Sequence, residues 1–173
     1  AAVVQGADTV MLSDETANGS YPVETVAAMR KTILYTQEHW PADLAAQSAV
    51  AKEEKSRNAI ARAAVTVAEE VGATAIVAET KSGATAANIA KMRPHLPICA
   101  VTSSPRAAQQ LALTYATRSF VRPDGEKAGL DLARELHDAN YFGSNESLTV
   151  VIVSGRQPGV AGGTDTVRVR VIE

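Results

Sequence analysis

The sequence predicts a doubly wound α/β domain, with helices covering both faces of a mostly parallel sheet of five strands. Short apolar runs alternate with stretches of helical periodicity from residue 56 onwards. The run LTVVIVSG at residues 148–155 is almost entirely apolar, as expected of a strand covered on both faces. The final run, TDTVRVRVIE, instead alternates valine with arginine, so one face is apolar and the other charged. Only a short loop precedes this run, which predicts antiparallel pairing at the edge of the sheet.

Composition narrows the classes of function. The chain has 173 residues, of which 46% are hydrophobic and 21% charged, as in ordinary globular proteins. The net charge of -2 gives no basic surplus, so neither nucleic acid nor a membrane is predicted as a partner. No apolar run approaches the roughly 20 residues of a membrane span, and no basic leader precedes one. A cytoplasmic location is therefore predicted.

The first part of the chain predicts a strand, a helix and a linker. Residues 9–12 form a short apolar run that predicts a buried strand, and the polar loop SDETANGS follows it. Pro22 suits the first turn of a helix, which Pro41 would end. Residues 43–55 are rich in Ala, Lys and Glu with weak periodicity, and we interpret them as a linker. A lone strand needs partners, so we expect a further part of the protein upstream.

The remaining elements alternate in type. Ser56 is the predicted N-cap of a helix that Gly72 ends, with Ile60, Ala63, Ala64, Val67, Ala68 and Val71 as its apolar side. Later helices are predicted at residues 83–93, from Pro105 to about 115 after an N-cap at Ser104, and at 126–140. Strands are predicted at residues 74–80, 97–103, 119–122, 148–155 and 164–173. The strand at 74–80 is placed centrally. The nine-residue loop 155–163 is short for a helical crossover, so the last strand is expected to pair antiparallel with the strand at 148–155.

Two loops are predicted to meet at the carboxyl edge of this sheet, where such folds bind ligands. In TKSGAT, the hydroxyls of Thr80, Ser82 and Thr85 and the charge of Lys81 suit a phosphate, and Gly83 permits close backbone approach. The following helix would present unpaired N–H groups to an anion. An ordinary turn, with Ser82 as N-cap and Gly83 as spacer, explains the loop equally well.

The second loop, SGRQPGVAGG, contains four glycines and one proline. Its candidate ligand-facing residues are Arg156, Pro158, Gly159, Gly162 and Gly163. A plain surface turn explains this loop as well as a ligand flap does.

Other chemical motifs are sparse. The G-x-G-x-x-G and G-K-[ST] patterns are absent, and His39, His95 and His137 lack metal-ligand spacing. No metal site is therefore predicted. Cys99 lies in the apolar run PICAV and is expected to be a buried, inert thiol. Asp14 and Glu15, beside Ser13, have the chemistry to bind a cation or relay a proton, although an exposed polar loop is the favoured interpretation.

The segment GADTVMLSDETANGSYPVETVAAM resembles the last strand and helix of the catalytic barrel of pyruvate kinases, which read G-A-D-x-V-M-L-S-G-E-T-A-x-G-x-Y-P-x-E. TKSGATAANIAKMRPHLPICAVTSSPRAAQQLAL is similar to the C-terminal domain of that family, and SGRQPGVAGGTDTVRV to its effector loop and last strand. The resemblance implies that residues 1–42 are the last unit of a (β/α)8 TIM barrel, 43–55 a linker, and 56–173 the allosteric and oligomerisation domain.

For the full enzyme, the resemblance implies transfer of phosphate from phosphoenolpyruvate to ADP in glycolysis, with Mg²⁺ and K⁺, by a homotetramer. Ser13 and Glu15 would line the substrate site, whereas the metal ligands and most catalytic residues would lie on earlier barrel strands. We therefore expect these 173 residues to be inactive alone. A sugar phosphate or nucleotide effector would bind between the two loops, with its phosphate held by Thr80, Lys81, Ser82, Gly83 and Thr85.

The sequence departs from the family pattern at both sites. Asp14 replaces a glycine beside the substrate site, where an added carboxylate is expected to alter the loop or weaken binding of an anionic substrate. Ala84 stands where arginine or lysine is frequent, and the second loop has no tryptophan, so the identity of the effector is left open. A stand-alone phosphate-ligand sensor or assembly module without catalysis is an alternative. A flavodoxin-like nucleotide binder explains the alternating elements, but it does not explain MLSDETANGSYP.

Overall fold

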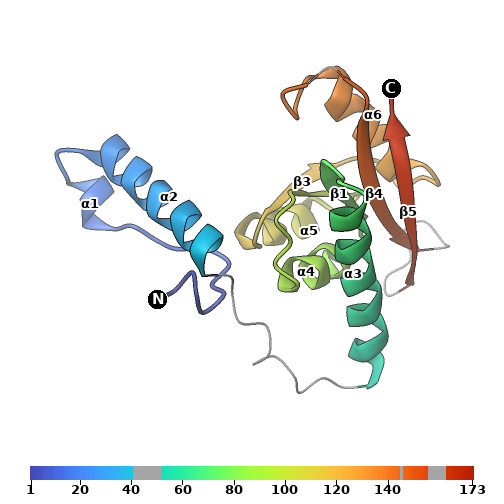
Figure 1. Ribbon diagram of the computed structural model, residues 1–173, viewed down its shortest axis with the longest axis horizontal. Helices are drawn as coiled ribbons and strands as arrows, with labels where there is room; N and C mark the ends of the chain where they lie inside the picture. Colours follow the sequence, from blue (N-terminus) through green and yellow to red (C-terminus); the bar gives the residue numbers. More distant parts are fainter. Residues whose placement is uncertain (41–51, 145, 156–162) are drawn as a thin grey trace. The chain divides into compact units, whose positions relative to one another are not determined.

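The computed structural model describes residues 1–40, 52–144, 146–155 and 163–173, without the side chains of 52–57. The chain divides into two compact units, Ala1–Ser48 and Ala49–Glu173 (Figure 1). The predicted linker, 43–55, lies largely outside the described residues. Within the described residues, no helix has the length and apolar character that crossing a membrane requires.

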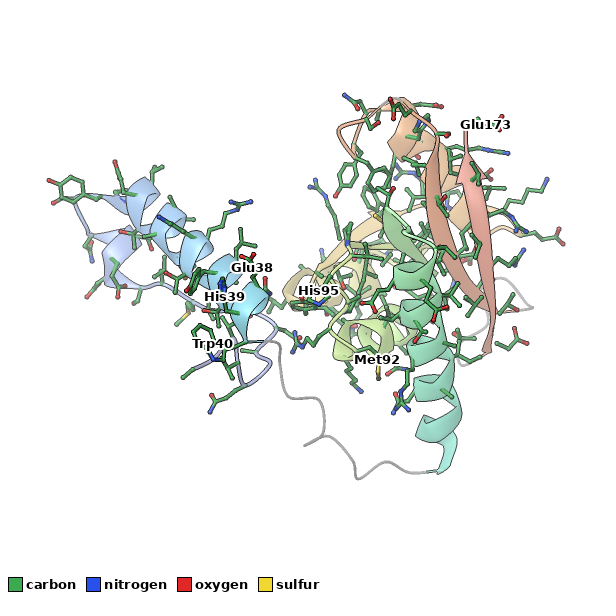
Figure 2. All side chains as sticks on the ribbon, in the orientation of Figure 1. Glu38, His39, Trp40, Met92, His95 and Glu173 are labelled. Atoms are coloured by element: carbon green, nitrogen blue, oxygen red, sulfur yellow. The ribbon has the colours of Figure 1, made fainter. Side chains whose placement is uncertain are left out.

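The first unit contains α1 (Asp14–Ala17) and α2 (Pro22–His39). Pro22 occupies the first turn of α2, as predicted, because its missing N–H costs nothing there. At the other end, the N–H of Trp40 donates to the carbonyl of Thr36 at 2.8 Å. Figure 2 shows His39 and Trp40 at this end of α2, and the His39 ring stacks on Tyr35 with 4.0 Å between ring centroids.

The strand predicted at residues 9–12 is wrong, because these residues have no regular secondary structure. A strand must pair its backbone groups with a neighbour, and the described part of this unit contains no other strand. Met11 is accordingly 89% exposed, and Val23 on α2 is 76% exposed. None of residues 1–40 is buried, so this segment has no core of its own within the described residues.

The second unit is built on a five-stranded sheet. Its strands are β1 (Ala75–Glu79), β2 (Ile98–Thr102), β3 (Thr117–Val121), β4 (Leu148–Gly155) and β5 (Thr164–Ile172), in the order β3-β2-β1-β4-β5. The first four are parallel, and β5 pairs antiparallel with β4. The predicted central position of β1 and the antiparallel edge strand are both confirmed.

Helices cover both faces of this sheet. They are α3 (Lys52–Glu70), α4 (Ala84–Lys91), α5 (Pro105–Gln110), the 3₁₀ helix η2 (Leu111–Leu113) and α6 (Ala128–Asp138). Alternation along β1 sends Ile76 into a core cluster with α3 and α4, and Val77 into a cluster with α6. The doubly wound α/β fold is confirmed, and the carboxyl ends of four strands share one edge.

The predicted start and buried face of α3 need correction. The helix begins at Lys52, four residues before Ser56, because Lys and Glu are good helix formers and extend it. Its buried residues include Ala61 and Ala64, whereas Ala63 and Val71 are exposed. The helix is rich in alanine around most of its circumference, so periodicity alone does not select the packed side. Gly72 follows the helix with φ of +62°, as predicted.

The helix after β2 is shorter than predicted. Ser104 caps it by accepting a hydrogen bond from the N–H of Ala107 at 3.2 Å, as expected. The α-helical part ends at Gln110, and Tyr115 lies beyond it, with the guanidinium of Arg93 4.5 Å from its ring centroid. On α6, Leu132, Ala133 and Leu136 are all buried.

Candidate functional site

The loop between β1 and α4 brings the backbone to the carboxyl edge of the sheet. Gly83 is the N-cap of α4 and has φ of +89°, a left-handed conformation that glycine adopts without strain. Its N–H donates to Oγ1 of Thr80 at 2.9 Å. No side chain caps α4, so the interpretation of Ser82 as the N-cap is wrong. The Ser82 side chain is exposed instead.

The two candidate loops meet at the first turn of α4. The hydroxyl oxygens of Thr85 and Thr164 are 2.7 Å apart, and Thr164 begins β5 directly after Gly163. A Cβ on Gly155 would lie 2.5 Å from the carbonyl oxygen of Gly163, so the two ends of the second loop are in close contact. Arg156, Pro158, Gly159 and Gly162 fall outside the described residues.

Lys81 joins a polar cluster at the ends of three strands. Its Nζ donates to Oγ of Ser103 at 2.6 Å and to Oδ2 of Asp124 at 2.7 Å. The Ser103 hydroxyl also donates to Asp124, at 2.9 Å. Hydrogen bonds from Lys81 and then Ser103 hold the pKa of the Asp124 carboxyl below its usual value.

Sequence reasoning missed Ser103 and Asp124 as members of the site. Ser103 ends the strand predicted at 97–103, and Asp124 lies two residues after the strand predicted at 119–122. Both residues lie at or just after the carboxyl ends of predicted parallel strands. Because ligands bind at that edge of such sheets, this position could have identified them as candidate site residues.

Glu79, the last residue of β1, faces the opposite side of the sheet from α4. Its Oε1 accepts a hydrogen bond from the N–H of Gly129, in the first turn of α6, at 2.9 Å. Burial raises the pKa of Glu79, and the Gly129 hydrogen bond and the charge of Arg168 partly oppose this. The N-terminus of α6 therefore already holds a carboxylate, whereas the first turn of α4 contains no acidic residue.

Ser13 and Glu15 lie together in one exposed turn of the first unit. The N–H of Ser13 donates to Oε2 of Glu15 at 3.0 Å. Bonds from the backbone N–H groups of Glu15 itself and of Ser13 lower the pKa of Glu15. Asp14 does not join them, because its Oδ1 accepts from Nδ2 of Asn18 at 3.1 Å. Among the described residues, no three His, Cys, Asp or Glu side chains are grouped as metal ligands.

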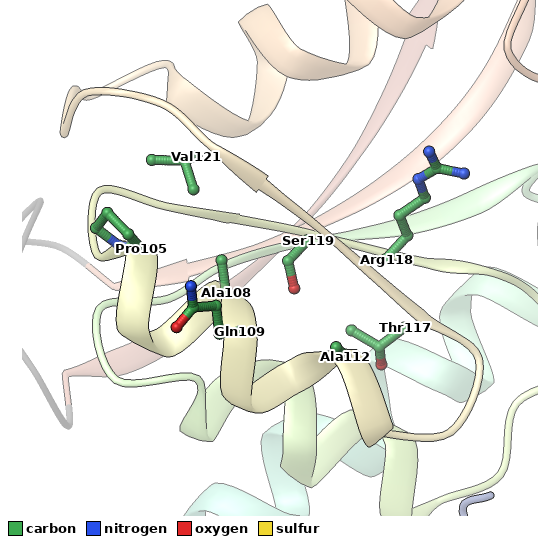
Figure 3. Close-up of a pocket in the computed structure, with 8 residues that line it drawn as sticks. All are labelled: Pro105, Ala108, Gln109, Ala112, Thr117, Arg118, Ser119 and Val121. Atoms are coloured by element: carbon green, nitrogen blue, oxygen red, sulfur yellow. The ribbon is translucent and has the colours of Figure 1, made fainter.

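A separate groove lies between α5 and β3. Its volume is about 480 Å³, and its lining residues are Pro105, Ala108, Gln109, Ala112, Thr117, Arg118, Ser119 and Val121. Figure 3 shows the Ser119 hydroxyl pointing toward the helical side of the groove, while the Arg118 side chain extends away from it. None of these residues belongs to the predicted site.

The fold and the converging loops define a doubly wound α/β domain with a candidate anion site at the carboxyl edge of its sheet. Residues 58–170 match the family model described as the pyruvate kinase α/β domain. The chain belongs to the pyruvate kinase family, as its motifs predict.

Relatives within this family align with nearly the whole chain. It is 36% identical over 178 residues to pyruvate kinase 2 of Synechocystis sp., covering 99% of this chain and 29% of that protein. It is 38% identical over 172 residues to a pyruvate kinase of Agrobacterium vitis, covering 97% and 36%. For a pyruvate kinase of Mycobacterium tuberculosis the identity is 35% over 181 residues, covering 99% and 36%. The chain thus spans about a third of the length of these curated relatives.

Proposed function

We propose that the chain is the C-terminal part of a cytoplasmic pyruvate kinase, which transfers phosphate from phosphoenolpyruvate to ADP and yields pyruvate and ATP in glycolysis. Within that enzyme, residues 56–173 would bind a phosphorylated effector, either a sugar phosphate or a nucleotide. The Thr85–Thr164 hydrogen bond carries this proposal, because it brings the end of the second loop to the first turn of α4.

The first turn of α4 has the properties that a phosphate requires. Its leading N–H groups have no partner within the helix, and the helix dipole favours an anion there. Gly83 supplies the left-handed turn that starts the helix, and the Ser82 hydroxyl is exposed beside it. Lys81 adds a positive charge to the same loop. A phosphate bound here would contact the β1–α4 loop and the start of β5 together, which provides a route for regulating the barrel.

The catalytic contribution of this chain is limited to the exposed turn of Ser13 and Glu15, which would line the substrate site. Phosphoryl transfer depends on positioning and on neutralising charge, and the full enzyme would use Mg²⁺ and K⁺ for the latter. Among the described residues, no three His, Cys, Asp or Glu side chains form a metal site, and the ligands of both ions would come from the earlier barrel strands. A coupled pyruvate assay on the 173 residues is expected to give no turnover.

Assembly into a homotetramer would use the C-terminal domain. The strand β5 stands at the end of the strand order, and Val171 on it is 61% exposed. Apolar side chains on an edge strand suit a contact with another subunit. Sedimentation of the full-length enzyme, with and without Val171→Lys, would test this contact.

Calorimetric titration tests the effector site. Fructose 1,6-bisphosphate, other sugar phosphates and nucleotides are titrated into the chain, and one class is expected to bind. Ser82→Asp should abolish that binding, because it places a negative charge at the N-terminus of α4. Ser144→Asp adds the same charge at an exposed loop position before β4, at the other edge of the sheet, and should leave binding intact. Unchanged binding by Ser82→Asp would contradict the site.

A stand-alone phosphate sensor or assembly module is the second candidate. One observation favours it: among the described residues, the buried core residues all lie in the unit Ala49–Glu173. The gene upstream of the codon for Ala1 decides between the two. A continuous reading frame for seven further strand–helix units supports the enzyme, and a start codon immediately before Ala1 supports the module.

A further inference from the structure

Lys81 is engaged by side chains from two other strand ends. Its ammonium group has three N–H donors, and two of them point to Ser103 and Asp124. Because Ser103 also donates to Asp124, the three side chains form a closed triangle in which the Asp124 carboxylate is the sole anion.

The carboxylate of Asp124 resembles part of a phosphate in its chemistry. An oxygen that bears negative charge and accepts from an ammonium and a hydroxyl makes the contacts that a phosphate oxygen makes. Asp124 belongs to the connection between β3 and α6 and is followed by Gly125, around which a side chain would meet no atom within 4 Å. The carboxylate thus reaches Lys81 from a loop with space beside it.

We propose that Asp124 is an internal competitor for the anion site, occupying on Lys81 and Ser103 the hydrogen-bond positions that a bound phosphate would take. This inference rests on the proposed function, since it requires a phosphate to bind the β1–α4 loop. Binding then exchanges one acceptor for another: Lys81 stops donating to Asp124 and donates to a phosphate oxygen instead. The strength of the internal ion pair would set the affinity of the site.

We expect the exchange to be reversible and the effect of Asp124 on phosphate affinity to be modest. The side chains of Lys81 and Asp124 are 38% and 40% exposed, so water screens their attraction. Exposed ion pairs of this kind are weak, and removing the competitor should tighten phosphate binding about two- to fivefold. A change of this size is measurable by titration.

The test follows the backbone amides of Ser82 and Gly83 by NMR while inorganic phosphate is titrated into the 173-residue chain. Asp124→Asn keeps the shape of the side chain and removes its charge, and it should lower the apparent Kd about two- to fivefold. Asp138→Asn is the matched control. It removes an equal charge from an exposed side chain at the C-terminal end of α6, toward the amino edge of the sheet, and should leave the Kd unchanged.

A double-mutant cycle with Lys81→Gln separates competition from general repulsion. If Asp124 acts by occupying Lys81, the gain from Asp124→Asn should disappear once Lys81 is replaced. An undiminished gain in the Lys81→Gln background would overturn the inference, as would equal affinities of the Asp124→Asn variant and the unmodified chain. If neither protein binds phosphate, the proposed effector site itself fails, which is a distinct result.

Discussion

The hydroxyl oxygens of Thr85 and Thr164 lie 2.7 Å apart, although 79 residues separate them in the sequence. One belongs to the first turn of α4 and the other begins β5. The bond therefore couples the candidate phosphate loop to the strand at the edge of the sheet. A ligand that moves one of these elements acts directly on the other.

Replacing Thr164 by valine should destabilise the domain. The Thr85 side chain is 9% exposed, so its hydroxyl would lose a partner in a site with little access to water. Leaving such a group unsatisfied costs about 1–3 kcal/mol of unfolding free energy. Thr164→Ser keeps the hydroxyl and is the control in urea denaturation. Equal stabilities of the two variants would show that the bond contributes nothing.

Gly83→Ala should be more damaging than Gly72→Ala. Both glycines have positive φ, and an alanine there costs roughly 1–2 kcal/mol in backbone strain. A Cβ at residue 72 meets no atom within 4 Å, whereas at residue 83 it lies 3.3 Å from Cγ of Leu111. Gly83→Ala should therefore show the lower midpoint in urea and weaker phosphate binding by calorimetry. Equal losses in the two variants would contradict the close packing of this loop.

Glu79→Gln should change how stability depends on pH. Burial raises the pKa of Glu79 above its ordinary value of 4.5, so the folded state binds its proton more tightly than the unfolded state. Stability from this group is thus present below pH 4.5 and declines as pH rises toward the raised pKa. Glutamine still accepts from Gly129 but carries no charge. The stability of the variant relative to the unmodified chain should increase from pH 4 to pH 7 in urea titrations, and a flat difference would refute the assignment.

The thiol of Cys99 should be inert in the folded chain. Burial raises its pKa to about 11, with Arg118 opposing the shift. At pH 8 roughly one thiol in a thousand would then be ionised, and its 1% exposure also excludes reagents. A disulfide reagent such as dithionitrobenzoate should react quickly in denaturant and very slowly without it. Rapid, complete labelling of the native protein would disprove burial.

Sequence patterns predicted the sheet well because the relevant signals are local. The apolar run of β4 indicates a strand covered on both faces, and most of its residues are buried. The alternation along β5 is less informative, because Val167 packs against the core whereas Val169 is 39% exposed. The short connection between those strands then fixes their antiparallel pairing. Residues 9–12 show the limit of this reasoning, since an apolar run becomes a strand only when another strand is available to pair with it.

Side-chain partners were less predictable than the loops that carry them. Thr80 and Gly83 share one turn, so their proximity follows from the sequence. The contact of Lys81 with Asp124 spans 43 residues and depends on how far each loop extends beyond its strand. The start of α3 at Lys52 was missed for a different reason, because Lys and Glu suit both an exposed helix and a linker.

Glu79 makes the two faces of the sheet differ in how they would receive an anion. An anion approaching α6 would meet the like charge of this carboxylate, which already accepts the Gly129 amide. On the other side of the same strand, the first turn of α4 contains no acidic residue. One acidic side chain at the end of the central strand therefore makes the two helix N-termini unequal, because that of α6 is already neutralised from within the domain.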